Sequence, residues 1–250
     1  MFYTYQTCRL GLMRVGIYGL GRFGTLWASI LSKKFTVFAY NRTPRPCPLE
    51  SVHLVPLNRL SECDVLFLCT AISSIEPVLN EISPLLKPGA LVADTCSVKM
   101  YPIQVMERLL PSSVFILGTH PMFGPDSARN GIQDLPMILT PVRLSENQVI
   151  FWKEMFESLG LRVIQMSAEE HDREAAFTQG ITHVIGRVLK DMDLQPSPIA
   201  TVGYKKLLEI VDQTCNDPWQ LFLDLQQYNP YTREMREKLQ GSFQRIFTKL

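Results

Sequence analysis

Short apolar runs and longer amphipathic stretches alternate along the first two thirds of the chain. The predicted strands lie at residues 14–18, 35–40, 64–69, 90–94, 114–117, 136–140 and 162–165. The run at 64–69 is typical of a strand buried on both faces of a parallel sheet. Amphipathic stretches between them lie at residues 25–32, 75–86, 100–110 and 145–158. This alternation predicts an α/β fold with a doubly wound, largely parallel sheet.

The pattern changes at Ser167. Strand-like runs cease there, and helical stretches follow at residues 167–193, 203–214, 217–227 and 229–249. We therefore expect two domains, an α/β domain over residues 1–166 and a smaller all-helical domain over residues 167–250. A helical domain of this size is marginal for an independent core, so we expect it to pack on the sheet domain and on a second copy of itself, forming a homodimer.

Composition narrows the classes of partner. Of 250 residues 46% are hydrophobic, and 25 basic and 24 acidic residues give a formal net charge of +1. The charges are scattered, which indicates neither a nucleic-acid footprint nor a polybasic membrane anchor. No apolar run reaches the roughly 18 residues that a membrane span needs. A small molecule is the expected partner.

The cysteines and the amino-terminal segment bear on the cellular location. The six cysteines lack metal-ligand spacing, so we expect reduced thiols in the cytoplasm and no metal site. Residues 1–12 lack the ordered regions of a signal peptide, which predicts either a frayed extension or a native start at Met13.

A glycine fingerprint joins the first predicted strand to the first predicted helix. Its sequence is Gly19-Leu20-Gly21-Arg22-Phe23-Gly24. In such a turn the first glycine permits the tight bend, the second lets backbone amides approach a pyrophosphate, and the third allows close packing of helix on strand. The helix amino terminus adds partial positive charge. The segment predicts a Rossmann-type domain that binds a dinucleotide through residues 19–24.

The second predicted strand ends at Asn41-Arg42-Thr43. An enzyme that prefers NAD usually carries Asp or Glu at this position, to bind the ribose hydroxyls. Asn41 stands there instead, and Arg42 and Thr43 offer a cation and a hydroxyl to a 2′-phosphate. The segment favours NADP, with NAD possible, although a solvated loop arginine is also consistent with it.

Candidate chemical groups follow several predicted strands. Thr70, Ser97 and His120 all fall at carboxyl ends of strands, where doubly wound sheets bind their ligands. His120 and Asp126 lie within the segment 118–127. An imidazole that is neutral near pH 7 suits proton transfer. The pattern indicates an oxidoreductase with its own acid-base group, with Thr70 as a further cofactor contact.

The long helix predicted at residues 167–193 has two distinct faces. One is an apolar stripe that includes Phe177 and Val188, and the other is a polar stripe of Gln179, His183 and Arg187 at i, i+4 and i+8. The polar stripe is consistent with a solvated surface and equally with a surface that faces a ligand or a partner.

Four segments together resemble the prephenate/arogenate dehydrogenase family of tyrosine biosynthesis: residues 19–24, 94–99, 118–127 and 178–187. The resemblance extends over nearly the whole chain. From Pro198 to Asn229 the sequence is more similar to arogenate dehydrogenases of plants and cyanobacteria than to bacterial prephenate enzymes. The resemblance implies an NAD(P)-dependent oxidative decarboxylation of a cyclohexadienol, in which hydride leaves the carbon bearing the hydroxyl and the ring carboxylate departs as carbon dioxide.

The resemblance also assigns roles to residues. It implies that His120 accepts the proton of the ring hydroxyl as hydride leaves, and that Ser97 orients His120 or this hydroxyl. Arg187 is implied as a clamp for a substrate carboxylate, since its planar guanidinium can bind bidentately. The implied substrate contacts are Asp126, Gln179, His183 and Arg187.

Departures from the family pattern favour arogenate over prephenate. The prephenate branch carries a second histidine where this chain has Gly186, and its downstream carboxylate-binding arginine has no clear counterpart between Pro198 and Lys206.

The alternatives are prephenate dehydrogenase, a β-hydroxyacid dehydrogenase and a nucleotide sensor without catalysis. A β-hydroxyacid dehydrogenase would place a lysine on the long helix, and a sensor would have no need of Ser97, His120 and Asp126 together.

Overall fold

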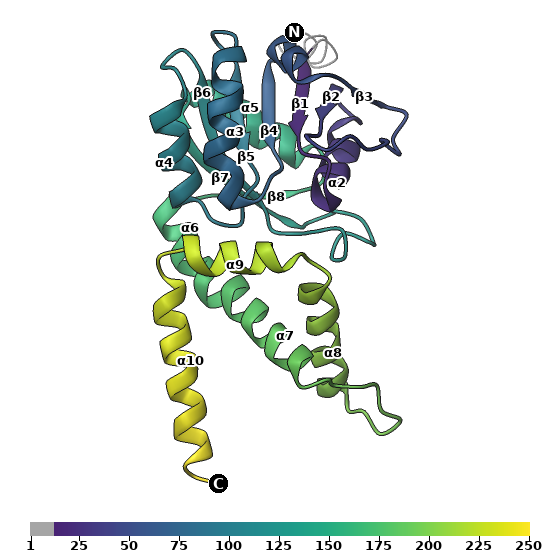
Figure 1. The fold of residues 1–250 in the computed structure, drawn as a ribbon, viewed down its shortest axis with the longest axis vertical. Coiled ribbons are helices and arrows are strands. Elements are labelled where there is room, and N and C mark those ends of the chain that lie inside the picture. The colour runs from purple at the N-terminus through teal and green to yellow at the C-terminus, as the bar shows by residue number, and fades with distance from the viewer. Residues whose placement is uncertain (1–12) are drawn as a thin grey trace. The chain divides into compact units, whose positions relative to one another are not determined.

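The computed structural model describes residues 13–250 as two compact units, divided after Ala168 (Figure 1). The expectations of a frayed leader and of a native start at Met13 concern residues 1–12, which lie outside the described residues. None of the helices formed by residues 13–250 is long and apolar enough to cross a membrane.

The first unit is built on an eight-stranded sheet in the order β3-β2-β1-β4-β5-β6-β7-β8. The strands are β1 Arg14–Tyr18, β2 Thr36–Tyr40, β3 Val52–Leu54, β4 Val65–Leu68, β5 Leu91–Asp94, β6 Phe115–Pro121, β7 Pro136–Arg143 and β8 Arg162–Gln165. Neighbouring strands are parallel except β6 and β7. The predicted doubly wound α/β fold is confirmed. Its strand order reverses between β1 and β4, where such sheets bind ligands beyond their carboxyl ends.

Helices cover both faces of this sheet. They are α2 Arg22–Leu31, α3 Ile75–Ile82, α4 Met100–Leu109 and α5 Glu146–Glu157, with short 3₁₀ turns η1 Leu57–Glu62, η2 Ile72–Ser74 and η3 Ser83–Leu85. Helices α3 and α4 pack against each other in front of the sheet in Figure 1, whereas α5 lies behind it. A capping box of Ser145 and Gln148 starts α5.

An aromatic cluster fixes α2 and α5 on one face of the sheet. The indole of Trp27 on α2 lies 5.6 Å from the ring of Phe67 on β4 and 5.9 Å from that of Phe156 on α5, measured between ring centroids. All three side chains are fully buried. Aromatic pairs at such distances add stability beyond the area they bury, so the cluster anchors the helix that begins at the glycine turn.

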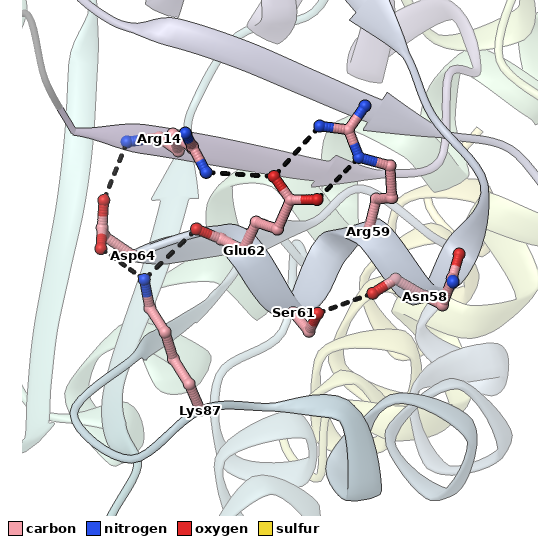
Figure 2. A network of polar contacts seen from close by, with 7 residues as sticks. All are labelled: Arg14, Asn58, Arg59, Ser61, Glu62, Asp64 and Lys87. Carbon is pink, nitrogen blue, oxygen red and sulfur yellow. Dashed lines mark hydrogen bonds and ion pairs between the residues drawn. The ribbon is translucent and has the colours of Figure 1, made fainter.

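A polar network joins the amino ends of β1 and β4 (Figure 2). The backbone N–H of Arg14 donates to Asp64 Oδ2 at 2.9 Å, and the Arg14 guanidinium pairs with Glu62 at 3.0 Å. Arg59 forms two hydrogen bonds with the same Glu62 carboxylate, and Lys87 Nζ lies 2.7 Å from Asp64 Oδ1. The paired side chains are between 34% and 49% exposed, so each pair contributes at most about 1 kcal/mol.

The second unit is helical. Its helices are α6 Ala168–Ala175, α7 Ile181–Asp191, α8 Val202–Cys215, α9 Trp219–Tyr228 and α10 Thr232–Phe247, and a π-helical turn η4 Ala176–Gly180 joins α6 to α7. The predicted helix over residues 167–193 is therefore one helix with a π turn inside it. Such turns occur mostly as single insertions in α-helices, frequently at functional sites. On α9, Gln226 Nε2 donates to the Gly180 carbonyl at the end of this turn at 3.0 Å.

Gly186 lets α7 and α8 approach closely. A Cβ atom at this position would overlap Thr214 Oγ1 and lie 3.3 Å from the Ile210 carbonyl oxygen, both on α8. A histidine side chain at residue 186 therefore has no room in this packing. The contact gives a steric reason for glycine at this position.

Replacing Gly186 with alanine should destabilise the second unit. Overpacking of a tight interface typically costs about 1–3 kcal/mol. The matched control is Gly203→Ala on α8, where the nearest atom to a new Cβ lies 3.9 Å away. Urea unfolding should place Gly186→Ala below the wild type and Gly203→Ala at or above it, because alanine is the better helix former. Equal midpoints for the two variants would contradict the steric account.

Candidate functional site

The glycine turn between β1 and α2 is built by steric necessity. Gly19 has a φ of +103°, and a Cβ there would lie 2.5 Å from the Cys69 carbonyl oxygen. At Gly24 a Cβ would overlap the Gly19 carbonyl oxygen, so the helix can approach the strand only with glycine. At Gly21 no heavy atom lies within 4 Å of the added Cβ. The turn thus leaves open space beside Gly21 at the amino terminus of α2, the kind of position at which phosphate groups bind.

The backbone of Leu20, inside this turn, is held by the loop after β2. Its N–H donates to Asn41 Oδ1 at 2.8 Å, and its carbonyl accepts from Arg45 NH1 at 2.9 Å. Asn41 Nδ2 also donates to the Thr43 carbonyl at 2.5 Å. The structure therefore places Asn41 at the predicted cofactor position with a role in shaping the turn, and Arg42 and Thr43 are exposed beside it. The contact of Arg45 was not predicted from the sequence.

Asp126 lies against the glycine turn. Its carboxylate pairs with Arg22, the first residue of α2, at 2.7 Å and with Arg129 at 3.0 Å. The hydrogen bond from Arg22, followed by that from Arg129, lowers the pKa of Asp126 below its ordinary value. Asp126 thus joins the loop after β6 to the start of α2. The ring of Phe23 stacks on Trp27 with centroids 6.0 Å apart, so only its backbone belongs to the turn.

A buried ion pair lies at the carboxyl end of β5. Lys99 and Asp94 pair with each other, and the side chain of each is 0% exposed. Lys99 Nζ also donates to the Thr119 carbonyl on β6 at 2.5 Å. Asp94 accepts hydrogen bonds from the backbone N–H groups of Cys96 at 2.9 Å and Thr119 at 3.3 Å. The pair therefore ties the turn after β5 to the end of β6.

The two predicted catalytic residues are neighbours in sequence of the residues that this pair binds. His120 follows Thr119 directly and is 3% exposed. It lies inside β6, which runs on to Pro121, and not beyond the strand. Ser97 lies between Asp94 and Lys99, and its hydroxyl is buried without a hydrogen-bond partner among the described residues. A buried polar group without a partner calls for one, so the Ser97 hydroxyl is available to a ligand.

Thr70, at the carboxyl end of β4, has the same property. Its Oγ1 is buried, and no described residue hydrogen-bonds to it. Its methyl group would lie 3.4 Å from a Cβ at Gly19, so Thr70 borders the glycine turn. The first unit thus brings Thr70 to the turn, as expected for a cofactor contact.

The polar stripe of the second unit is withdrawn from solvent. His183 is 8% exposed, and burial followed by the nearby charge of Arg187 lowers its pKa to about 4, so it is neutral at pH 7. His183 Nδ1 and Gln179 Oε1 are buried without partners among the described residues. The sequence was consistent with a solvated surface or with a surface that faces a ligand or a partner. The burial of these atoms argues against the solvated surface.

Arg187 has local partners in the second unit. Its NH2 group donates to the carbonyls of Thr214 at 3.2 Å and Asp217 at 2.8 Å, at the end of α8. Its guanidinium carbon lies 5.1 Å from the ring centroid of Trp219. Basic side chains commonly satisfy the last carbonyls of a helix in this way. Arg187 therefore caps the carboxyl end of α8 through NH2. A contact with a substrate carboxylate would have to use its NH1 and Nε groups.

The residue pattern assigns no role to Lys99, which the structure places at the centre of the first unit's site. The available signal was a lysine five residues after the aspartate that ends a buried strand. Such a pair can meet across a short turn, but the sequence does not reveal that the lysine also reaches the neighbouring strand.

Two family models match the chain. Residues 50–165 match the model described as "Prephenate dehydrogenase, nucleotide-binding domain", and residues 188–250 match "TYRAAT1-like, C-terminal domain". "Arogenate dehydrogenase 1, chloroplastic" of Arabidopsis thaliana is 36% identical over 250 residues, which cover 95% of this chain and 39% of that relative. "Arogenate dehydrogenase 2, chloroplastic" of the same plant is 38% identical over 189 residues, which cover 73% and 53%. The chain therefore spans only part of these relatives.

Solved structures share the fold. Synechocystis arogenate dehydrogenase gives a TM-score of 0.67 at 21% identity, over 95% of this chain and 93% of that chain. Prephenate dehydrogenase from A. aeolicus, in complex with hydroxyphenyl propionate and NAD+, gives 0.71 at 20% identity, over 96% and 92%. The resemblance inferred from the four sequence segments is confirmed by the family model and by the plant relatives. The chain belongs to the prephenate/arogenate dehydrogenase family.

Proposed function

We propose that this chain is an NADP-dependent arogenate dehydrogenase, which converts arogenate to tyrosine by oxidative decarboxylation. The observation that carries the proposal is a buried pair, Asp94–Lys99, whose turn holds the unpartnered hydroxyl of Ser97 and whose lysine bonds the carbonyl directly before buried His120. The names of the two Arabidopsis relatives support arogenate as the substrate.

The proposed chemistry assigns one proton to His120. The cofactor, when bound, supplies the acceptor for the hydride that leaves the ring carbon. As the C–H bond breaks, the proton of the hydroxyl on the same carbon passes to His120, and a ring carbonyl forms. The bond to the carboxylate then breaks, carbon dioxide departs, and its electron pair completes the aromatic ring. The phenolate oxygen recovers a proton, with Ser97 hydrogen-bonded to it throughout.

The cofactor preference is proposed from the loop after β2. Asn41 puts no negative charge at the end of β2, and its Oδ1 is already used by Leu20 N–H. Arg42 and Thr43 are exposed, and Arg45 lies close to the turn through its bond to Leu20. Two cations and a hydroxyl beside the turn suit a 2′-phosphate, which supports NADP over NAD.

The remaining substrate contacts are proposed with different support. The buried, unpartnered atoms of Gln179 and His183 support a polar ligand for each of them. Asp126 stays a prediction, because the structure gives it two arginine partners. Arg187 also stays a prediction: its NH2 group has two carbonyl partners, while its Nε is buried without a partner among the described residues. Gly186, packed against α8, supports arogenate because it excludes the second histidine of the prephenate branch.

The cytoplasmic location stays a prediction. The described cysteines are free thiols, which agrees with a reducing compartment. The two plant relatives, however, are named as chloroplastic proteins.

Initial rates test the proposal. NADPH and NADH formation should be followed with arogenate and with prephenate, for the wild type and for His120→Asn. The account predicts fastest turnover with arogenate and NADP, and a loss of about 10²–10⁴-fold in kcat for His120→Asn, because general-base catalysis is removed. The exposed His53 provides the control, and His53→Asn should keep the wild-type rate. Preference for prephenate would change the substrate, and cofactor binding without any turnover would indicate a nucleotide sensor.

We also propose a homodimer formed through the second unit. Large apolar side chains are exposed near the end of α10, with Phe243 at 42%, Ile246 at 56% and Phe247 at 66%. On α7 Val188 is 44% exposed, and Met192 just beyond it is 63% exposed. Apolar surface of this kind commonly marks an interface. Sedimentation equilibrium should give the mass of two chains, and a mass of one chain at all concentrations would exclude the dimer.

A further inference from the structure

Lys99 is a charged residue in a fully buried position, where apolar side chains are usual. Its side chain is fully buried among the first unit's residues, next to the equally buried Asp94. Removing both charges from water is costly, and well-packed apolar residues often replace such a pair without loss of stability. The pair is therefore weakly explained by stability alone. We ask instead which groups the two side chains hold in place.

The pair fixes the backbone directly before His120. Lys99 Nζ donates to the Thr119 carbonyl at 2.5 Å, and this carbonyl belongs to the peptide group that carries the His120 N–H. The Thr119 N–H donates to Asp94 Oδ1 at 3.3 Å, and the Thr119 hydroxyl donates to the Asp94 carbonyl. All three polar groups of Thr119 are thus bonded to Asp94 or Lys99, so the peptide plane at His120 cannot rotate freely.

The same pair closes the turn that carries Ser97. Asp94 begins this turn, and its Oδ2 accepts from the Cys96 N–H at 2.9 Å. Lys99 ends the turn and returns to the same Asp94 carboxylate. Ser97 therefore lies in a loop anchored at both ends, and the anchor is also the group that binds β6. One ion pair thus contacts both the turn that carries Ser97 and the residue before His120.

We propose that Lys99, through its pair with Asp94, is a positioning residue for the reaction: it holds the His120 imidazole and the Ser97 hydroxyl at the spacing that proton transfer from a ring hydroxyl requires. The proposal rests on the proposed function for the roles of His120 and Ser97. Lys99 itself is fully buried. A misplacement of about 1 Å at a reacting group can cost about 100-fold in rate, so the loss of this anchor should act on kcat.

The test separates positioning from stability with two variants. Lys99→Met leaves the Asp94 carboxylate buried without its cation and should lower both Tm and kcat. The double variant Lys99→Met/Asp94→Asn removes the unpaired charge, so Tm should recover, while kcat stays about 100-fold below the wild type. The Kd for NADP should be unchanged in both. Recovery of kcat together with Tm in the double variant would overturn the proposal.

A matched control comes from the opposite ends of the strands. Lys87 and Asp64 also form a lysine–aspartate pair, but it lies at the amino ends of the strands and its side chains are 41% and 42% exposed (Figure 2). Lys87→Met/Asp64→Asn should leave kcat, and the Kd for NADP, at wild-type values. A loss of kcat in this control equal to that of the buried pair would also overturn the proposal.

A second readout does not depend on turnover. The ¹H–¹⁵N resonances of the His120 imidazole, assigned by their absence in His120→Asn, should shift in Lys99→Met and in the double variant without substrate, and stay unchanged in the Lys87 control. Unchanged His120 resonances in the Lys99 variants would refute positioning. If the wild type turns over neither arogenate nor prephenate, the proposed function fails, and the imidazole resonances still decide whether Lys99 positions His120.

Discussion

The ion pair between Asp94 and Lys99 organises the carboxyl ends of two neighbouring strands. Both side chains are fully buried, and between them they bond the backbone of Cys96 and every polar group of Thr119. Each charge depends on the other, because an isolated ion in this interior would be strongly disfavoured. The neighbours Ser97 and His120 inherit their positions from this mutual dependence, so the site's chemistry follows from a constraint on the backbone.

Tight steric contacts define the glycine turn, which is the other part of the first unit's site. The bend at Gly19 and the approach of α2 at Gly24 leave no room for a Cβ, whereas the space beyond Gly21 is open. The aromatic cluster of Trp27, Phe67 and Phe156 packs α2 against β4 and α5. A tight turn, a fixed helix and an open amino terminus together make the phosphate-binding geometry of a Rossmann domain.

The sequence predicted those features that local pattern controls. Short apolar runs predicted every strand of the sheet except β3, which has only three residues, two of them exposed. The glycine spacing predicted the turn at Gly19. Contacts between distant residues were not accessible: Lys99 reaching Thr119, Arg22 pairing with Asp126, and Arg187 closing α8. The π turn at 176–180 was also missed, because a 3.6-residue period assumes uninterrupted α-helix.

The state of the Lys99 side chain tests the central claim most directly. A lysine ammonium that is buried and hydrogen-bonded exchanges its protons slowly with water, so it gives an observable ¹H–¹⁵N signal at neutral pH. The account predicts such a signal for Lys99, with a scalar coupling across the hydrogen bond to the carboxylate carbon of Asp94. A Lys99 ammonium that exchanges as fast as the exposed lysines, without this coupling, would contradict it.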